Sequence, residues 1–148
     1  MKRVFGIAAL LALSAASATM AQEKPERAIR FRQGVYQVIG HYVGQMGQMV
    51  KGQRPFDRDA FVRDAAIVET MSRIVPEAFP PGSDKGKTRA KADIWRDADK
   101  FNAAVERFQS EAAKLHEVSK QGDADRIKSQ FGALAKACDN CHDDFRSK

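Results

Sequence analysis

The chain has 148 residues, with 25 basic and 19 acidic side chains, which is the size of one ordinary domain with a mildly basic charge. The charges are interspersed and form no basic run, which argues against a nucleic-acid-binding surface. Only two cysteines are present, so a framework of several disulfides is excluded.

The first 21 residues, MKRVFGIAALLALSAASATMA, have a basic start, an apolar run and a stretch of small residues, which is the pattern of a secretory signal peptide. We predict cleavage after Ala21, although cleavage after Ala18 also fits the pattern. A membrane anchor is the alternative, but the apolar run is too short to span a bilayer. We therefore expect a mature domain of residues 22–148 in the periplasm, without membrane insertion.

Two helices are predicted in the first half of the mature chain. From Pro25 to about Lys51, apolar residues recur at steps of three, four and seven, which is the spacing of one helical face. Gly52 suits the end of this helix. The second helix is predicted to follow Asp57, a residue type favoured as an N-cap, and to stop at Pro76.

The second half of the chain begins with a predicted long loop over residues 76–92, which are rich in proline, glycine and charge. Asp93 is expected to cap a third helix that runs on past Leu115 and ends at Gly122. Asp123 then opens a fourth helix. Because strand signals are almost absent, these four helices predict an all-α, antiparallel up-and-down four-helix bundle.

The fourth helix contains the sequence CDNCH at residues 138–142. Cys138, Cys141 and His142 stand at positions i, i+3 and i+4, which share one face of a helix. Two such thiols can form thioethers with the vinyl groups of a haem, and the adjacent imidazole can then reach the iron. We therefore predict one haem c per chain, covalently attached near the C-terminus on the inner side of the bundle.

A redox disulfide and a zinc site are the two alternatives for these cysteines. A thioredoxin-like pair needs its first cysteine at a helix N-terminus within a βαβ fold, and this sequence predicts no strands. A zinc site needs four ligands, so His41 or His116 would have to converge on the cysteines from other helices. The motif favours haem attachment over both.

The ligand on the second face of the iron decides between a saturated electron carrier and a site that is open to a small gas. After His142 the chain has only DDFRSK, so a second ligand would have to come from upstream. Met71 is most simply packed in the core, Met46 and Met49 are expected to pack at the end of the first helix, and the two histidines are expected to face solvent. Periodicity alone does not choose among these candidates: Met46, Met49, Met71, His41 and His116.

Several motifs of the mature chain resemble those of the cytochrome c prime family. Its members are exported four-helix-bundle cytochromes with haem attached near the C-terminus. Residues 138–146, CDNCHDDFR, are similar to the family's CxxCHxxF/Y-R/K ending, and residues 31–33, FRQ, to its aromatic-Arg-Gln element. Residues 49–53 fit the family's first interhelix loop, and residues 94–95 fit the start of its third helix. The late position of the haem motif together with the Arg-Gln element makes the resemblance specific.

On the proximal side of the haem, the resemblance implies a role for each matched residue. Cys138 and Cys141 would carry the thioethers, and His142 would be the only strong axial ligand of the iron. Arg146, one turn beyond His142, would lie beside the proximal imidazole.

On the other side, the resemblance implies that Arg32 and Gln33 contact the haem edge, with Arg32 suited to pair with a propionate. Tyr36, one turn after Arg32, falls at the family's distal position. A residue of the long loop would also lie near the haem edge, for which we choose Thr88, with Lys87 as its alternative.

The implied function is that of a haem protein with five-coordinate, high-spin iron that binds NO and CO and acts in electron transfer or NO resistance. The alternative is a low-spin electron carrier of the cytochrome c556 type, in which a methionine of the first helix ligates iron. Met46 lies ten residues beyond Tyr36, about 15 Å along the helix, which is too far to take that place easily. The family also implies a homodimer through helices one and two. We expect redox partner proteins but no enzyme activity, because no distal histidine and arginine pair is evident to cleave a peroxide bond.

Overall fold

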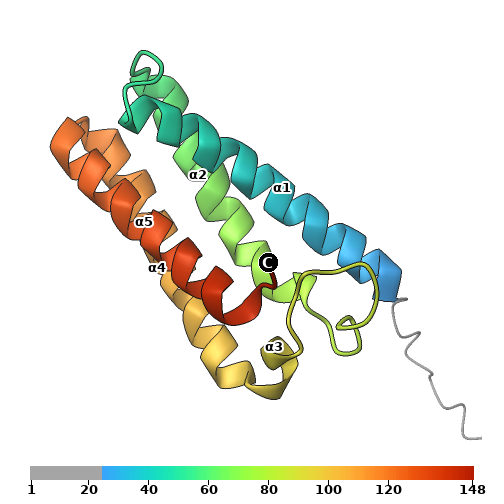
Figure 1. Ribbon diagram of the computed structural model, residues 1–148. Coiled ribbons are helices and arrows are strands. Elements are labelled where there is room, and N and C mark those ends of the chain that lie inside the picture. The colour runs from blue at the N-terminus through green and yellow to red at the C-terminus, as the bar shows by residue number, and fades with distance from the viewer. Residues whose placement is uncertain (1–24) are drawn as a thin grey trace, which may run out of the picture.

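The computed structural model describes residues 25–148, so the predicted signal peptide lies outside the described residues. Four long helices run alternately up and down, which confirms the predicted all-α four-helix bundle (Figure 1). They are α1 (Pro25–Val50), α2 (Arg58–Ile74), α4 (Ala98–Gln121) and α5 (Ala124–Phe145). A 3-10 helix, η1 (Val75–Ala78), and a short helix, α3 (Asp93–Arg96), lie between α2 and α4. None of the helices in residues 25–148 is both long and apolar enough to cross a membrane.

Aspartate side chains begin three of the four long helices. Asp57, Asp97 and Asp123 each accept a hydrogen bond from the backbone N–H three residues later, at 3.0, 3.3 and 3.0 Å respectively. This bond satisfies one of the N–H groups that a helix start leaves without a partner. Gly122 ends α4 with a φ of 77°, a left-handed conformation that favours glycine. The predicted boundaries at Asp57, Gly122 and Asp123 are therefore confirmed.

The predicted single helix from Asp93 is wrong, because the chain leaves the helical conformation at Asp97. Asp97 has φ and ψ of −123° and 64° and caps α4, whereas Asp93 is the first residue of α3 and no side chain caps that turn. The indole N–H of Trp95 donates to the carbonyls of Phe79 and Pro80, both at 3.2 Å. These bonds hold α3 against the loop that precedes it and not in line with α4.

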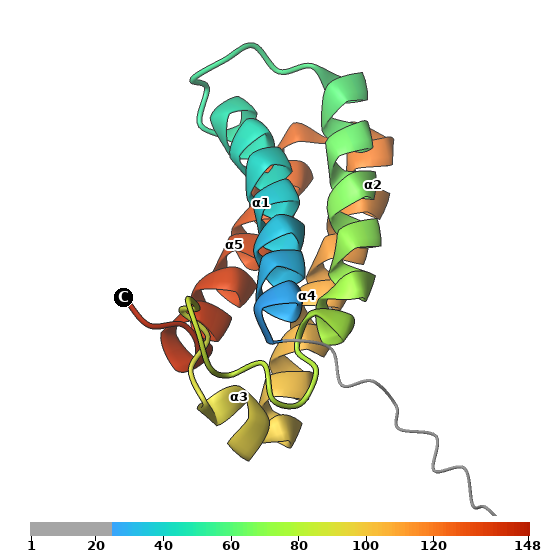
Figure 2. The same cartoon turned by 90° about the vertical axis from the view of Figure 1, so that its right-hand side faces the viewer.

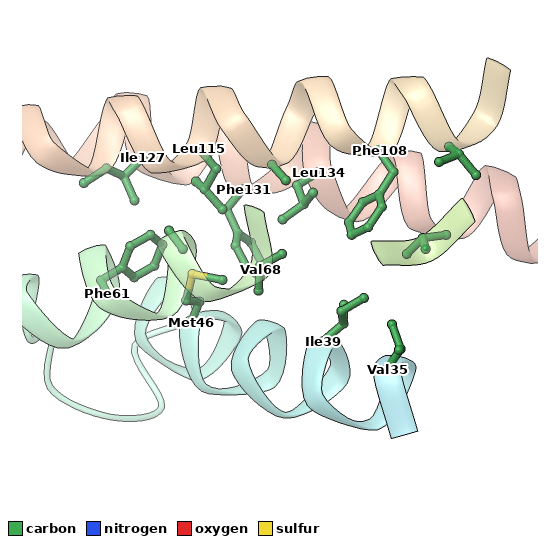
Figure 3. Packing of buried hydrophobic residues seen from close by; sticks show 14 of the residues in the cluster. Val35, Ile39, Met46, Phe61, Val68, Phe108, Leu115, Ile127, Phe131 and Leu134 are labelled. Atoms are coloured by element: carbon green, nitrogen blue, oxygen red, sulfur yellow. The ribbon is translucent and has the colours of Figure 1, made fainter. Parts of the chain in front are cut away.

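The core fills the space between the four helices and holds the largest side chains that are fully buried (Figure 3). Met46 and Met49, predicted to pack at the end of the first helix, are buried in this core, whereas Met71, predicted for the core, lies half-buried against it. The five largest fully buried residues come from all four long helices: Met46, Phe61, Leu115, Ile127 and Leu134.

The two upstream histidines differ in their surroundings. His41 is exposed, as predicted. His116 is not, because its side chain is only 18% exposed and its Nδ1 lies 2.7 Å from Oε2 of Glu69. This contact joins α4 to α2, so the prediction that His116 faces solvent is wrong.

The bundle is closed at one end and open at the other between α1 and α5. Each of the other neighbouring pairs of long helices packs closely, whereas α1 and α5 touch little. They meet at Gly47, where an added Cβ would lie 3.3 Å from Cζ of Phe131. From there the two helices separate toward the end of α5 that carries the cysteines (Figure 2). A cavity lined by Cys138 and Cys141 lies in the wedge between these diverging helices.

Candidate functional site

A cavity of about 560 Å³ fills the wedge between α1 and α5, a volume typical of cofactor and ligand sites. Side chains of α1, α4 and α5 form its largely apolar walls, and the loop between η1 and α3 forms its rim. All eight residues predicted for the site line this one cavity: Arg32, Gln33, Tyr36, Thr88, Cys138, Cys141, His142 and Arg146.

The α5 wall carries the predicted haem attachment motif. Both cysteines are free thiols that pack partly buried against the core. Burial raises the pKa of Cys138 to about 11, and burial also raises the pKa of Cys141. Burial lowers the pKa of His142, and the charge of Arg146 lowers it further. The wall therefore presents two neutral thiols and a neutral imidazole with a lone pair, which is a donor set that fits a covalently attached haem.

The two alternative interpretations of the cysteines find no support in this geometry. A reactive redox cysteine has a lowered pKa and stands at a helix N-terminus, whereas Cys138 lies deep in α5 with a raised pKa. A zinc site needs several converging ligands. In the part of the chain that the structure describes, no three His, Cys, Asp or Glu side chains converge as a metal site would require.

The α1 wall presents Tyr36 to the cavity. Its ring makes an edge-to-face contact with Phe79, with centroids 6.2 Å apart and planes at 74°. Burial raises the pKa of Tyr36, so its phenol is protonated at neutral pH. The five upstream side chains that could have ligated iron lie elsewhere. Within residues 25–148, the cavity wall holds His142 as its one histidine, and it holds no methionine.

Arg32 lies at the rim of the cavity, and it is buried, with 4% of its surface exposed. One terminal nitrogen, Nη1, donates to the carbonyl of Ala78 and to Oγ of Ser83, both at 3.1 Å. The other, Nη2, donates to the carbonyl of Ser83 and to Oγ1 of Thr88, both at 3.0 Å. The structure therefore brings Arg32 and Thr88, both predicted for the haem edge, into contact with each other, and it bonds the guanidinium to the loop.

Gln33 also binds this loop, since its Nε2 donates to the carbonyl of Lys87 at 3.0 Å. The end of the loop pairs in turn with the C-terminal tail. Ala90 forms an isolated antiparallel bridge with Arg146, and Nε of Arg89 donates to the carbonyl of Ser147 at 2.9 Å. The loop is thus attached to both α1 and the tail, and it closes the open end of the wedge.

Sequence reasoning missed three residues of the site. Phe79 and Trp95 lie on the guanidinium of Arg32, with ring centroids 4.8 and 5.7 Å from its Cζ. Arg89 lines both the main cavity and an adjoining cavity of about 250 Å³ that also borders His142. The sequence marks Arg89 only as one of several basic residues in the loop, so no pattern could have singled it out.

Comparison with known proteins finds similarity over nearly the whole described chain. The family model described as Cytochrome C' matches residues 27–146. Cytochrome c' of Rubrivivax gelatinosus is 39% identical over 127 residues, which cover 85% of this chain and 98% of that protein. Cytochrome c-556 of Agrobacterium tumefaciens is 30% identical over 117 residues, which cover 79% of this chain and 94% of that protein.

Solved structures show the same similarity in three dimensions. Cytochrome c prime from Shewanella frigidimarina has a TM-score of 0.83 and 39% identity, covering 86% of this chain and 99% of that one. Two variants of cytochrome c prime from Alcaligenes xylosoxidans, one a nitric oxide complex and one with carbon monoxide bound, each have a TM-score of 0.79 and 33% identity. Both alignments cover 85% of this chain and 98% of the other.

Proposed function

The chain belongs to the cytochrome c prime family, as its motifs predicted, and we propose that it is a periplasmic protein that binds NO and CO at a five-coordinate haem iron. Membership of the family implies a c-type haem cofactor. Cys138 and Cys141 would hold the haem through thioethers, and His142 would be the axial ligand. When bound, the haem supplies an iron that cycles between two oxidation states and can take a diatomic gas on its open face.

The composition of the cavity wall carries this proposal. A second strong ligand would have to project into the same cavity as His142, and the described wall offers no further histidine and no methionine. On the α1 side the wall offers Tyr36, whose protonated phenol is a poor ligand for iron. The half-buried ring of Tyr36 would instead shield the open face, so that a gas must displace it. The Alcaligenes xylosoxidans variants with nitric oxide and carbon monoxide bound support these two gases as ligands.

A low-spin, six-coordinate electron carrier is the second candidate, because cytochrome c-556 of Agrobacterium tumefaciens is among the relatives. Met46 and Met49, the methionines of α1, are buried in the core and lie outside the cavity wall. A methionine ligand from α1 would therefore require α1 to move. We favour the five-coordinate site for this reason.

The optical spectrum of the ferrous holoprotein, recorded with and without CO, tests the choice between the two candidates. We expect a high-spin spectrum that shifts when CO is added. A sharp low-spin spectrum that is indifferent to CO would overturn the gas-binding proposal and leave the electron carrier. The double variant Cys138→Ala/Cys141→Ala tests the attachment, because it should lose covalent haem by mass spectrometry.

Export and assembly belong to the same proposal. The signal peptide at residues 1–21 would deliver the chain to the periplasm, and the N-terminal sequence of the mature protein tests the cleavage site. A homodimer is supported by the outward face of α1, where Phe31 and Val38 are 46% and 38% exposed. Between them, a Cβ added at Gly34 would meet no other atom, so a second backbone can approach there. Sedimentation of the holoprotein, alone and as Phe31→Glu, tests this assembly.

Redox partner proteins would exchange electrons with the haem, and we propose no catalytic step. A peroxidase-like reaction needs a distal histidine and arginine to cleave the peroxide bond. In the described cavity wall the only histidine is on the attachment motif, and the guanidinium of Arg32 is bonded to the loop. Electron transfer and gas binding are therefore the activities that this site supports.

A further inference from the structure

Arg32 is a buried cation whose hydrogen-bonding capacity is almost fully used by the protein. A guanidinium has five N–H donors, of which four are on the two terminal nitrogens. In this structure Nη1 and Nη2 each donate to two oxygens of the segment from residue 78 to residue 88. None of these acceptors is a carboxylate. Phe79 and Trp95 contact the guanidinium as well, which fixes its plane.

This arrangement leaves Arg32 without a free pair of parallel N–H donors for an anion. Arginine recognises a carboxylate best through two parallel N–H donors, and both terminal nitrogens of Arg32 are already paired. Freeing them would leave the carbonyls and hydroxyls of the loop without their donor. One of these partners, Ser83, is buried with only 1% of its surface exposed, so no water could easily replace the arginine.

Two other arginines line the cavity, and among residues 25–148 neither has a partner for its terminal nitrogens, but the two differ in position. Arg146 follows the last turn of α5, and its backbone N–H donates to the carbonyl of His142 at 3.0 Å, so it lies beside the attachment motif. Arg89 directly follows Thr88 at the rim. Among residues 25–148 the guanidinium of Arg89 has a partner only at Nε, which donates to Ser147, so its two terminal nitrogens keep their four donors.

We propose that Arg89, and not Arg32, is the arginine that pairs with the carboxylates at the haem edge, and that Arg32 is the positioning residue that holds the loop as the rim of the cavity. The first half of this proposal rests on the haem attachment proposed above. The second half does not, because the contacts of Arg32 are all within the chain.

The pairing is tested by following the propionate carboxylate bands of the holoprotein in the infrared as a function of pH. A nearby arginine holds the pKa of a carboxyl about 1–3 units below its usual value. We expect Arg89→Gln to raise the pKa of one propionate by about 1 unit or more. Lys85→Gln is the matched control, because it removes an exposed charge of the same loop that does not line the cavity. A shift in Lys85→Gln equal to that in Arg89→Gln would contradict a specific pair.

The positioning role is tested by hydrogen exchange of the backbone amides in residues 83–90. Arg32→Lys keeps the charge but removes the fork, so we expect exchange in this segment to accelerate at least about tenfold, while the propionate pKa changes little. Ser83→Ala, which removes one acceptor of Arg32, is a milder second variant in case Arg32→Lys does not fold. It should accelerate exchange in the same segment to a smaller extent.

The outcomes separate the two proposals. A shift in the propionate pKa in Arg32→Lys but not in Arg89→Gln would overturn the assignment, as would unchanged exchange of residues 83–90 in both Arg32→Lys and Ser83→Ala. A chain that lacks covalent haem by mass would refute the proposed function and the pairing with Arg89. Exchange of the loop in the Arg32 and Ser83 variants would still decide the positioning role.

Discussion

The contribution of Tyr36 to gas binding can be estimated from its contacts. If the ring must leave its place before a gas reaches the iron, the edge-to-face contact with Phe79 at 6.2 Å is lost on the way. Such a pair contributes about 0.5–1.5 kcal/mol beyond its burial. At about 1.4 kcal/mol for each factor of ten, Tyr36→Ala should speed CO association by about two- to twelvefold from this contact alone. Loss of the ring's burial in the cavity adds to this figure.

CO association with the ferrous holoprotein, measured by stopped flow, is the direct assay. Tyr36→Phe keeps the ring and its contact with Phe79, so we expect its rate to stay within about twofold of the unmodified protein. Tyr42→Ala is the matched control, because Tyr42 is a half-buried tyrosine of the same helix that does not line the cavity. An association rate in Tyr36→Ala equal to that in Tyr42→Ala would refute the shielding role and point to another residue over the iron.

Three further predictions concern the bundle itself. Gly47→Leu would force a side chain against Phe131, 3.3 Å from the position of the added Cβ, and should lower the free energy of unfolding by about 1–3 kcal/mol in a denaturant titration. Hydrogen bonds from Arg73 and His116 lower the pKa of Glu69. The stability that they contribute is therefore fully present above the ordinary value of 4.5 and is lost as the pH falls through the lowered pKa of the folded state, so Glu69→Gln should flatten the dependence of the urea midpoint on pH below 4.5. In the chain produced without haem, backbone amide hydrogens should exchange faster at the end of α5 that carries the cysteines than around Phe131, where α5 packs against Gly47. Equal protection of the two parts of α5 would contradict a cavity that the haem fills.

The helices and the attachment motif could be predicted because their signals are local. An apolar face repeats at helical spacing, and an aspartate or a glycine marks a boundary through bonds within three or four residues. Asp57, Gly122 and Asp123 mark such boundaries in both the sequence and the structure. The spacing of the two cysteines likewise places them on one helical face whatever surrounds the helix.

The break between α3 and α4 could not be predicted by the same means. Asp93 and Asp97 are both suitable N-caps, four residues apart, and the apolar positions continue across both of them. The choice is made by Trp95, whose indole bonds to carbonyls 15 and 16 residues earlier in the chain. His116 shows the same limit, since its partner Glu69 is 47 residues away on α2.

The cavity between α1 and α5 would make the proposed haem part of the core of this protein and not only of its surface. A cavity of about 560 Å³ is far larger than the roughly 150 Å³ that a stable engineered protein can keep empty. Gly47 lets α1 and α5 meet at one end, and the loop bound to Arg32 closes the other. The apolar walls in between have no partner among residues 25–148. The proposed haem, a flat and largely apolar group, would provide the contacts that α1 and α5 do not make with each other.

The role of Arg32 shows what a motif can and cannot specify. The Arg-Gln element predicts Arg32 at the edge of the haem site, and in the structure Arg32 lines the cavity. A motif does not tell which donors of the side chain are free, because that depends on Ser83 and Thr88, more than 50 residues away. Because both terminal nitrogens are paired with the loop, the charge of Arg32 stays at the rim, but its parallel N–H donors are no longer available to a carboxylate. On our proposal the anionic edge of the haem pairs with Arg89 instead, which stands next to Thr88 with its terminal nitrogens unpaired among the described residues.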